Sequence, residues 1–390
     1  LRVVDCRKPV IFLDGKYIDM AESLGSLKRT HYCGVLTEGD IGKRVCVMGW
    51  VQRRRDLGSL LFIDLRDRTG LVQLAFDEQS DPAVREKGVA CRSEYVVAAT
   101  GVVRERQSKN PNLPTGSIEV YADELRILAE AETPPFEIVE GTKANEELRL
   151  KHRYLDLRRP DLMKNLLFRH RVAKLTRDYF DENGFIEIET PMLIRSTPEG
   201  ARDYLVPSRV HKGSFYALPQ SPQLYKQLSM VAGFDRYIQL ARCFRDEDLR
   251  ADRQPEFTQI DMEMSFADET DIMQIIEGFM KRLFAETLGV ELQTPLPRYT
   301  YRECMERFGS DKPDTRFGME IQNITEAVKG IEFPVFTGAV EAGGSVRAIV
   351  AEGAAATYTR KEIDKLTDFV KTYRAKGLAF TRFTADGVSS

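Results

Sequence analysis

The segment from Arg242 to Phe266 constrains the fold of this chain more than any other, because it alternates like two strands joined by a charged loop. Polar and apolar residues alternate after Phe257, which predicts a strand with one buried face. The first strand ends near Arg245, whose planar guanidinium suits a phosphate and a carboxylate alike. The ring of Phe257 is suited to stacking on a purine. The segment therefore predicts a nucleotide-binding hairpin, with a solvated, charged hairpin as the ordinary alternative.

Length and composition predict a multidomain, soluble and cytoplasmic protein. The chain of 390 residues exceeds one typical core. Hydrophobic residues make up 42% and charged residues 30%, and no apolar run is long enough to span a bilayer, so we expect no membrane partner. The net charge of −3 means that any nucleic acid must be bound by local basic patches. The six cysteines form no metal-ligand cluster, so we expect reduced thiols and no metal site within this chain.

Five short runs of alternating apolar residues follow one another in the first third of the chain. They cover residues 43–52, 60–66, 71–76, 95–103 and 118–128. Five short strands predict a small barrel. Pro134 and Pro135 interrupt the pattern and predict a linker.

Three consecutive arginines at 53–55 precede Phe62, which lies on the next predicted strand. Small barrels bind single-stranded nucleic acids by placing cations on the phosphates and aromatic rings on the bases. An arginine run by itself is more often a solvated strand edge. The sequence alone leaves both interpretations open.

From residue 145 the periodicity becomes helical. Phe168, Val172, Leu175 and Tyr179 recur at spacings of three and four, which predicts a helix with one buried stripe. Gly184 is placed to end this helix. A strand that Pro191 stops is expected to begin at Phe185, and a second long helix is expected from about 269 to 288.

The hairpin at 242–266 resembles the second signature motif of the class II aminoacyl-tRNA synthetases, and in detail that of the bacterial aspartyl-tRNA synthetases. The helix and strand before it resemble the family's first motif, which forms a homodimer interface. RFGSDKPDTRFG, at 307–318, resembles the passage into an insertion domain. The family's third motif does not occur before Ser390, so we expect a chain that is C-terminally incomplete and inactive by itself.

This resemblance implies an α+β multidomain fold. It comprises an N-terminal five-stranded OB-fold barrel (29–130), a linker (131–158), a class II antiparallel sheet flanked by helices (159–312) and the start of an α+β insertion domain (313–390). Residues 1–28 match nothing in the family and are an extension of unclear status.

The resemblance also implies attachment of L-aspartate to tRNA(Asp) through an aspartyl-adenylate, with ATP as substrate and Mg²⁺ as its companion ion. Arg245 is the implied catalytic residue. The residues implied for ATP are Arg245, Asp246, Glu247, Gln254 and Phe257. Those implied for aspartate are Glu199, Gln223, Lys226, Arg245 and Asp261. The implied anticodon contacts are Arg55, Phe62 and Gln73, and the implied acceptor-end contacts are Arg250 and Arg253.

Simpler interpretations remain for single residues. Glu199 follows Pro198 and fits a turn, and Lys226 fits a solvated helix position. One alternative function is a dual-specificity enzyme that also charges asparagine tRNA, although Leu57 favours relatives that serve aspartate tRNA alone. Another is a tRNA-binding fragment without catalysis.

Overall fold

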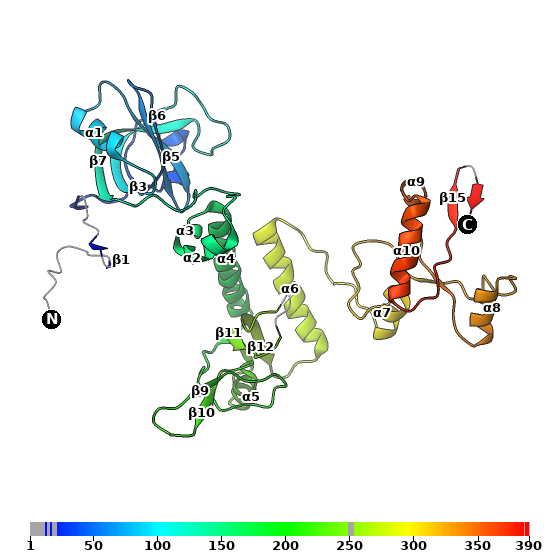
Figure 1. Cartoon of the computed structure of the whole chain (residues 1–390). Coiled ribbons are helices and arrows are strands. Elements are labelled where there is room, and N and C mark those ends of the chain that lie inside the picture. The colour runs from blue at the N-terminus through cyan, green and yellow to red at the C-terminus, as the bar shows by residue number, and fades with distance from the viewer. Residues whose placement is uncertain (1–11, 14–15, 18–21, 249–252, 386, 390) are drawn as a thin grey trace. The chain divides into compact units, whose positions relative to one another are not determined.

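The computed structural model describes residues 12–13, 16–17, 22–248, 253–385 and 387–389. The chain divides into two compact units, 1–292 and 293–390 (Figure 1). The predicted domain limits, including the one between 312 and 313, remain predictions.

The first unit contains a closed five-stranded barrel in the order β3-β4-β5-β7-β6, as predicted. All neighbouring strands are antiparallel except β5 and β7. The first strand extends beyond its predicted end and carries all three arginines at 53–55. A short helix between β5 and β6 was not predicted. The bounds are β3 Arg44–Asp56, β4 Leu61–Asp67, β5 Gly70–Phe76, α1 Pro82–Ala90, β6 Val96–Glu105 and β7 Ile118–Ala129.

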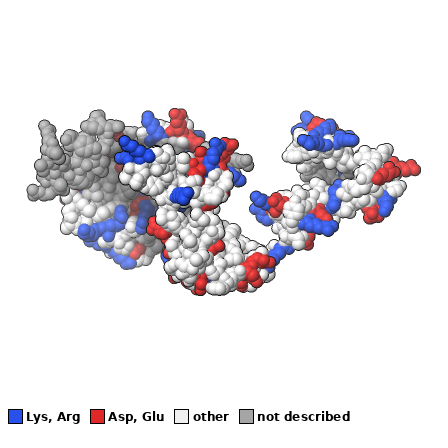
Figure 2. All heavy atoms as spheres, turned by 90° about the horizontal axis from the view of Figure 1, so that it is seen from below, with Lys and Arg blue, Asp and Glu red and all other residues white. Residues whose placement is uncertain are grey.

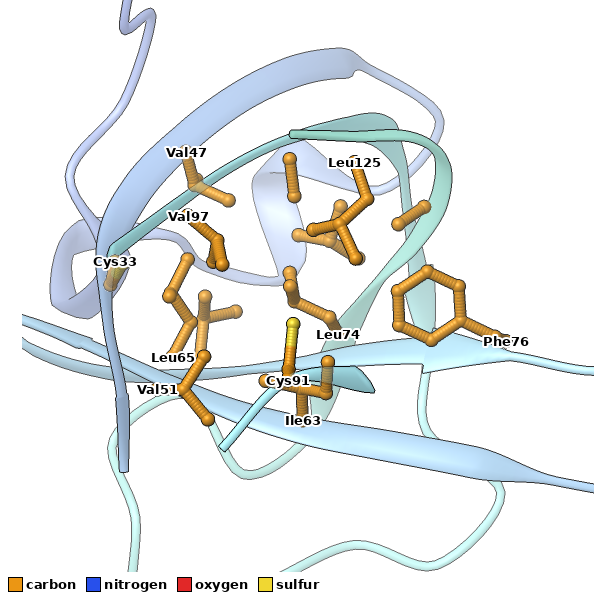
Figure 3. Packing of buried hydrophobic residues seen from close by; sticks show 14 of the residues in the cluster. Cys33, Val47, Val51, Ile63, Leu65, Leu74, Phe76, Cys91, Val97 and Leu125 are labelled. Atoms are coloured by element: carbon orange, nitrogen blue, oxygen red, sulfur yellow. The ribbon is translucent and has the colours of Figure 1, made fainter. Parts of the chain in front are cut away.

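Alternate residues of the barrel strands form its core. Figure 3 shows side chains such as Val47, Ile63, Leu74 and Val97 directed toward one another inside the barrel. Each of these is fully buried, and burial of such a side chain stabilises the fold by about 1.5–3 kcal/mol. The intervening residues point outward, which leaves one polar surface for other contacts.

The segment before the barrel packs on its outside. Glu22 accepts a hydrogen bond from the backbone N–H of Ile127 (2.8 Å) and pairs with Lys87 (2.5 Å). The backbone N–H of Cys33 donates to Asp67 (2.6 Å). The short elements here are β1 Phe12–Leu13, β2 Lys16–Tyr17, η1 Cys33–Val35 and η2 Glu38–Asp40.

The segment predicted as a linker has a small core of its own. Phe136, Ile138 and Leu155 pack together in it. Two short helices, α2 Glu146–Lys151 and α3 Arg153–Asp156, follow. The carboxylate of Asp156 is fully buried and accepts hydrogen bonds from Arg153 and Arg159 (2.6 and 2.8 Å). The segment is therefore an ordered connection.

A three-stranded sheet in the order β12-β11-β8 lies further along the chain. The predicted helix 269–288 is confirmed, with an N-terminal capping box at Asp268 and Gly289 in the left-handed conformation after its end. The strand expected between Phe185 and Pro191 pairs as a ladder over two residues only. The bounds are α4 Pro160–Glu182, β8 Ile186–Glu187, β9 Leu205–Pro207, β10 Phe215–Ala217, α5 Gln223–Val231, β11 Arg236–Phe244, β12 Glu256–Met264 and α6 Glu269–Leu288.

Helices α4 and α6 cover one face of this sheet. Their contact is a cluster of Phe180, Phe185, Ile238 and Phe279, with rings in edge or tilted contact. The buried stripe predicted for α4 is wrong at its start, because Phe168 is 43% exposed. The tight packing begins one to two turns later, where α6 and the sheet meet the helix.

The second unit consists of short elements around a few buried apolar residues. Its small core residues include Cys304, Val328, Val346 and Ile363. Helices α7 and α10 each begin with a capping box. The bounds are α7 Tyr301–Phe308, β13 Gln322–Asn323, α8 Pro334–Glu341, β14 Arg347–Ala348, α9 Ala354–Thr357, α10 Arg360–Thr372, β15 Arg382–Thr384 and β16 Gly387–Ser389.

Charged side chains are distributed in several groups over the surface. Figure 2 shows Lys and Arg gathered in separate patches, with Asp and Glu among them, on the face that it presents. No described helix combines the length and the apolar character needed to cross a bilayer.

Candidate functional site

The hairpin of β11 and β12 presents two different faces. Cys243 lies opposite Phe257, and Gln239 lies opposite Asp261, so these four residues share one face. The neighbouring pair of Ile238 and Met262 points to the other face and packs against α4 and α6. The first face is therefore free to carry polar chemistry.

Arg245 and Phe257 lie together at one end of the polar face. The guanidinium carbon of Arg245 is 5.1 Å from the centre of the Phe257 ring, which is a cation–π contact. The backbone N–H of Arg245 donates to the carbonyl of Pro255 (2.9 Å), which closes the hairpin beside the ring. No carboxylate pairs with this guanidinium among residues 22–248 and 253–385. Its donors are therefore available to an anionic ligand.

Lys226 reaches the same face from α5. Its Nζ lies 2.9 Å from Oδ1 of Asp261 and 3.4 Å from Oε2 of Glu263. The side chain of Lys226 is 12% exposed and that of Asp261 is 9% exposed, so the solvated helix position considered for Lys226 is excluded. Burial acts to lower the pKa of Lys226, but its partners Asp261 and Glu263 outweigh burial and raise it. The lysine is thus held in its charged form.

Asp261 keeps one acceptor atom unused. Its Oδ2 is buried and has no hydrogen-bond partner among the described residues. Burial raises the pKa of the Tyr237 hydroxyl, and the negative charge of Asp261 raises it further. A buried carboxylate oxygen without a donor is uncommon in folded proteins. It suits a ligand that brings its own N–H donor.

Glu199 is held on the loop before β9. One carboxylate oxygen accepts a hydrogen bond from Thr197 (2.8 Å) and the other from Ser221. Gln220 is 2% exposed and makes hydrogen bonds to the backbone N–H and carbonyl of Ala201 (2.9 and 2.8 Å). We did not predict roles for Ser221 and Gln220, although both lie in the QSPQ run beside predicted residues.

The thiol of Cys243 is buried on β11, on the hairpin face that also carries Phe257 and Asp261. Burial raises the pKa of Cys243 to about 11, and the charges of Asp261, Arg245, Glu199 and Lys226 also act on it. All four of these charged side chains were predicted for the site. Of these, Lys226 pairs directly with Asp261, Arg245 lies against Phe257 on the face that carries Asp261, and Glu199 accepts a hydrogen bond from Ser221, two residues before α5.

The remaining predicted residues lie nearer the surface. The side chain of Glu247 pairs with Arg253 (3.1 Å), and Gln254 is exposed. The backbone N–H of Asp246 donates to the carbonyl of Arg202 (3.0 Å). Gln223 is the first residue of α5, one turn before Lys226. Arg250 lies outside the described residues.

The three residues predicted to contact an anticodon meet on the outer face of the barrel. Arg55 lies opposite Phe62 in the ladder, and its guanidinium is 5.5 Å from the ring centre. The Nη2 atom of Arg55 donates to Gln73 (2.8 Å) and lies 3.1 Å from Asp64. A cation and a half-buried ring are thus held side by side on adjacent strands.

Gln73 also belongs to a larger polar network that the sequence did not reveal. It accepts a hydrogen bond from Arg106 (2.6 Å) and donates one to the buried carboxylate of Glu119 (2.6 Å). Glu119 in turn pairs with Arg104 (2.7 Å). The Nε atoms of Arg55 and Arg106 are buried and have no partner among the described residues. These unused donors suit an anion on this face.

The described residues do not bring together the ligands that a metal ion needs. No cluster of three or more possible ligands (His, Cys, Asp or Glu) occurs in the described part of the chain. The described residues therefore do not form a Mg²⁺ site by themselves.

Both the barrel and the hairpin match known families. Residues 145–383 match the class II tRNA synthetases (D, K and N), and residues 45–128 match an OB-fold nucleic-acid-binding domain of the tRNA anticodon type. The chain belongs to the class II tRNA synthetase family. It is 61% identical over 363 residues to an aspartate–tRNA ligase of Ruminiclostridium cellulolyticum, and 57% identical over 371 residues to one of Clostridium botulinum. These matches cover 93% and 95% of this chain, which spans 61% and 62% of the two relatives.

Solved structures agree with this fold. The crystal structure of asparaginyl-tRNA synthetase from Pyrococcus horikoshii with asparaginyl-adenylate matches 68% of this chain and 59% of its own, with a TM-score of 0.58 and 26% identity. A putative aspartyl-tRNA synthetase from Leishmania major matches 69% of this chain and 54% of its own, with a TM-score of 0.59. Because the sequence identity is 24% in the second case, this similarity shows a shared fold and nothing more.

Proposed function

We propose that this chain takes part in the ATP-dependent attachment of L-aspartate to tRNA(Asp). The observation that carries the proposal is the polar face of the hairpin, where Lys226 pairs with Asp261 and Arg245 lies against Phe257. An amino acid has an ammonium and a carboxylate, so it needs partners of both signs. The similarity to aspartate–tRNA ligases supports aspartate as the amino acid.

The first reaction joins two anions. The α-carboxylate oxygen of aspartate attacks the α-phosphorus of ATP, the new C–O–P bond forms, and the bond to the leaving pyrophosphate breaks. No side-chain nucleophile is needed, so catalysis depends on positioning and on neutralisation of charge. Arg245 supplies the cation, and Phe257 beneath it stacks on adenine. Glu247, Gln254 and Asp246 contact ATP from the loop.

The family's use of ATP makes Mg²⁺ part of the proposal. A Mg²⁺ ion bound to the phosphates would neutralise part of their charge. The described residues do not form a site for it, so we assign it no ligand in this chain.

Aspartate recognition rests on charge in this proposal. Lys226 binds the side-chain carboxylate, Gln223 helps to orient the substrate, and Glu199 with the unused Oδ2 of Asp261 receives the ammonium. Asparagine would bring a neutral amide to a nearly buried lysine, which costs an ionic hydrogen bond in a site of low solvent access. This supports selection of the acid over the amide.

The barrel supplies the RNA contacts. Phe62 stacks on an anticodon base, Arg55 binds the backbone beside it, and Gln73 reads the base. Arg253 and Arg250, in the loop between β11 and β12, meet the acceptor end of tRNA(Asp). The unused guanidinium Nε atoms of Arg55 and Arg106 support the anionic character of the ligand on this face.

A homodimer and a cytoplasmic location complete the proposal. Leu166, Leu167 and Phe168 on α4 are 52%, 48% and 43% exposed, which supports a second copy covering this end of the helix. The reaction takes place where tRNA is used, which supports the cytoplasm as the location. Light scattering of the purified chain measures whether it forms the dimer.

Charging assays test the proposed activity. The complete gene product that contains these residues should attach labelled aspartate to a tRNA(Asp) transcript and release pyrophosphate in the presence of ATP. Attachment to tRNA(Asn) as well would establish the dual-specificity alternative. Binding of tRNA without any charging would establish the non-catalytic alternative and refute the proposal.

A further inference from the structure

The carboxylate of Glu94 joins the barrel to the segment that follows it. It accepts two hydrogen bonds from Nη2 of Arg66, at 2.7 and 2.8 Å, and one from Nη1 of Arg158, at 2.7 Å. Arg66 lies on β4 of the barrel, whereas Arg158 lies between α3 and α4. Glu94 is 3% exposed, so water does not compete for these bonds. We name Glu94, Arg66 and Arg158 the Glu94 clamp.

The backbone at Glu94 is held in an unusual conformation. Its φ is +65°, a region that residues other than glycine rarely adopt. The N–H of Glu94 donates to the carbonyl of Val51 (2.7 Å), and the carbonyl of Tyr95 accepts from the N–H of Val51 (2.9 Å). Such a conformation persists where its surroundings determine it. The direction of the Glu94 side chain is therefore fixed by the barrel.

Arg158 is held from a second side. Its guanidinium carbon is 4.9 Å from the centre of the Trp50 ring on β3. It thus makes an ionic contact and a cation–π contact with the barrel at once, and its planar guanidinium suits both. Nη1 of Arg66 also reaches the carbonyl of Ile138 (3.5 Å), in the small core of the connecting segment.

Arg158 is two residues before Pro160, the first residue of α4. Helix α4 packs on the sheet that carries the polar face with Arg245 and Lys226. We propose that the Glu94 clamp is a positioning device that fixes the barrel to the start of α4, so that RNA bound on the barrel is presented to that sheet. We assign the clamp a role in geometry because a buried ionic contact by itself is weak evidence for added stability. The inference rests on the proposed function, because it assumes that one RNA contacts both parts.

Distance measurements test the clamp directly. Spin labels on the exposed sites Glu86→Cys, on α1, and Lys164→Cys, on α4, report the separation of the barrel and the helix in a Cys6→Ser background. The five described native cysteines are buried and free, which limits unwanted labelling. Arg158→Met should broaden the distribution of distances while the far-ultraviolet circular dichroism stays unchanged. An unchanged width would overturn the proposal.

A matched control and a second variant separate the clamp from general damage. Arg44→Met removes the exposed pair of Arg44 and Asp123 on the same barrel, and it should leave the distance distribution narrow. Glu94→Gln keeps the shape of the side chain and should broaden the distribution as Arg158→Met does. Equal broadening by Arg44→Met would overturn the assignment to this carboxylate.

RNA binding tests the consequence. Arg158→Met should bind the anticodon stem-loop of tRNA(Asp) within about twofold of the parent chain, but whole tRNA(Asp) roughly tenfold more weakly, because two contacts on one ligand lose their fixed spacing. Equal loss for both RNAs, or no loss for either, would contradict the positioning role. If the parent chain binds neither RNA, the proposed function fails, and the distance measurement still decides the clamp.

Discussion

Nζ of Lys226 lies 2.9 Å from Oδ1 of Asp261, so a helix and a strand are joined by an ion pair at the centre of the polar face. Both side chains are nearly buried. The lysine that we assign to the substrate carboxylate is therefore oriented by a carboxylate of the protein before a substrate enters. This pairing makes the site both a binding surface and a part of the folded structure.

Loss of one partner of this pair should destabilise the fold. Lys226→Met leaves Asp261 buried without its cation, and we expect the free energy of unfolding to fall by about 3 kcal/mol. Urea denaturation followed by circular dichroism measures the change. Lys174→Met, which removes a partner from the exposed pair with Asp178, is the control and should change it by less than about 0.5 kcal/mol. Equal effects of the two variants would contradict the buried pair.

The same pair predicts a pH dependence. Because the folded state raises the pKa of Lys226 above its ordinary value of 10.5, the stabilisation is fully present below that value and is lost as the pH rises through the folded pKa. The difference in unfolding free energy between the parent chain and Lys226→Met should thus be constant from about pH 6 to 9 and decrease only above about pH 10.5. A difference that disappears near neutral pH would refute this assignment.

Arg245→Ala should remove activation without unfolding the chain. In the complete gene product we expect the rate of aspartyl-adenylate formation to fall roughly 100- to 1,000-fold, because the negative charge that grows at the phosphorus loses its cation. Pyrophosphate exchange measures this rate. Arg242→Ala is the control, since Arg242 is opposite Thr258 and belongs to the other face of the hairpin. A normal exchange rate in Arg245→Ala would remove the basis of the proposed mechanism.

Phe62→Ala should weaken RNA binding at the barrel. Loss of one stacked base costs about 1–3 kcal/mol, which is roughly a 5- to 150-fold rise in the Kd for the anticodon stem-loop. Fluorescence anisotropy with the 390-residue chain measures it. Phe215→Ala, an exposed ring on β10, should have no effect. An equal Kd for Phe62→Ala and the parent chain would argue against stacking at this ring.

The strands were predictable where one face is buried and the other is not. The barrel strands and the β11–β12 hairpin alternate clearly, and their predicted and observed limits differ by a few residues. The prediction that Phe168 is buried was wrong, because helical spacing does not show which part of a long helix contacts its neighbours. The predicted length of the strand after Gly184 was too great, because β8 pairs with β11 over two residues only.

The polar contacts were less accessible to sequence reasoning. The types of residues in the site were predicted, but the pairing of Lys226 with Asp261 and Glu263 depends on how α5 lies on the sheet. The connecting segment was predicted as a linker because Pro134 and Pro135 interrupt the strand pattern. Its order comes from a small apolar core together with buried carboxylates bound by arginines, as at Asp156, and spacing patterns do not reveal such pairs.

The alternation of faces along β11 and β12 separates residues that form the polar site from residues that pack against the helices. Asp261 and Glu263 lie beside Lys226 on the polar face, while Ile238 and Met262 on the other face hold the helices behind them. Substitutions at every second residue can therefore alter the polar face without disturbing the helix contacts behind it.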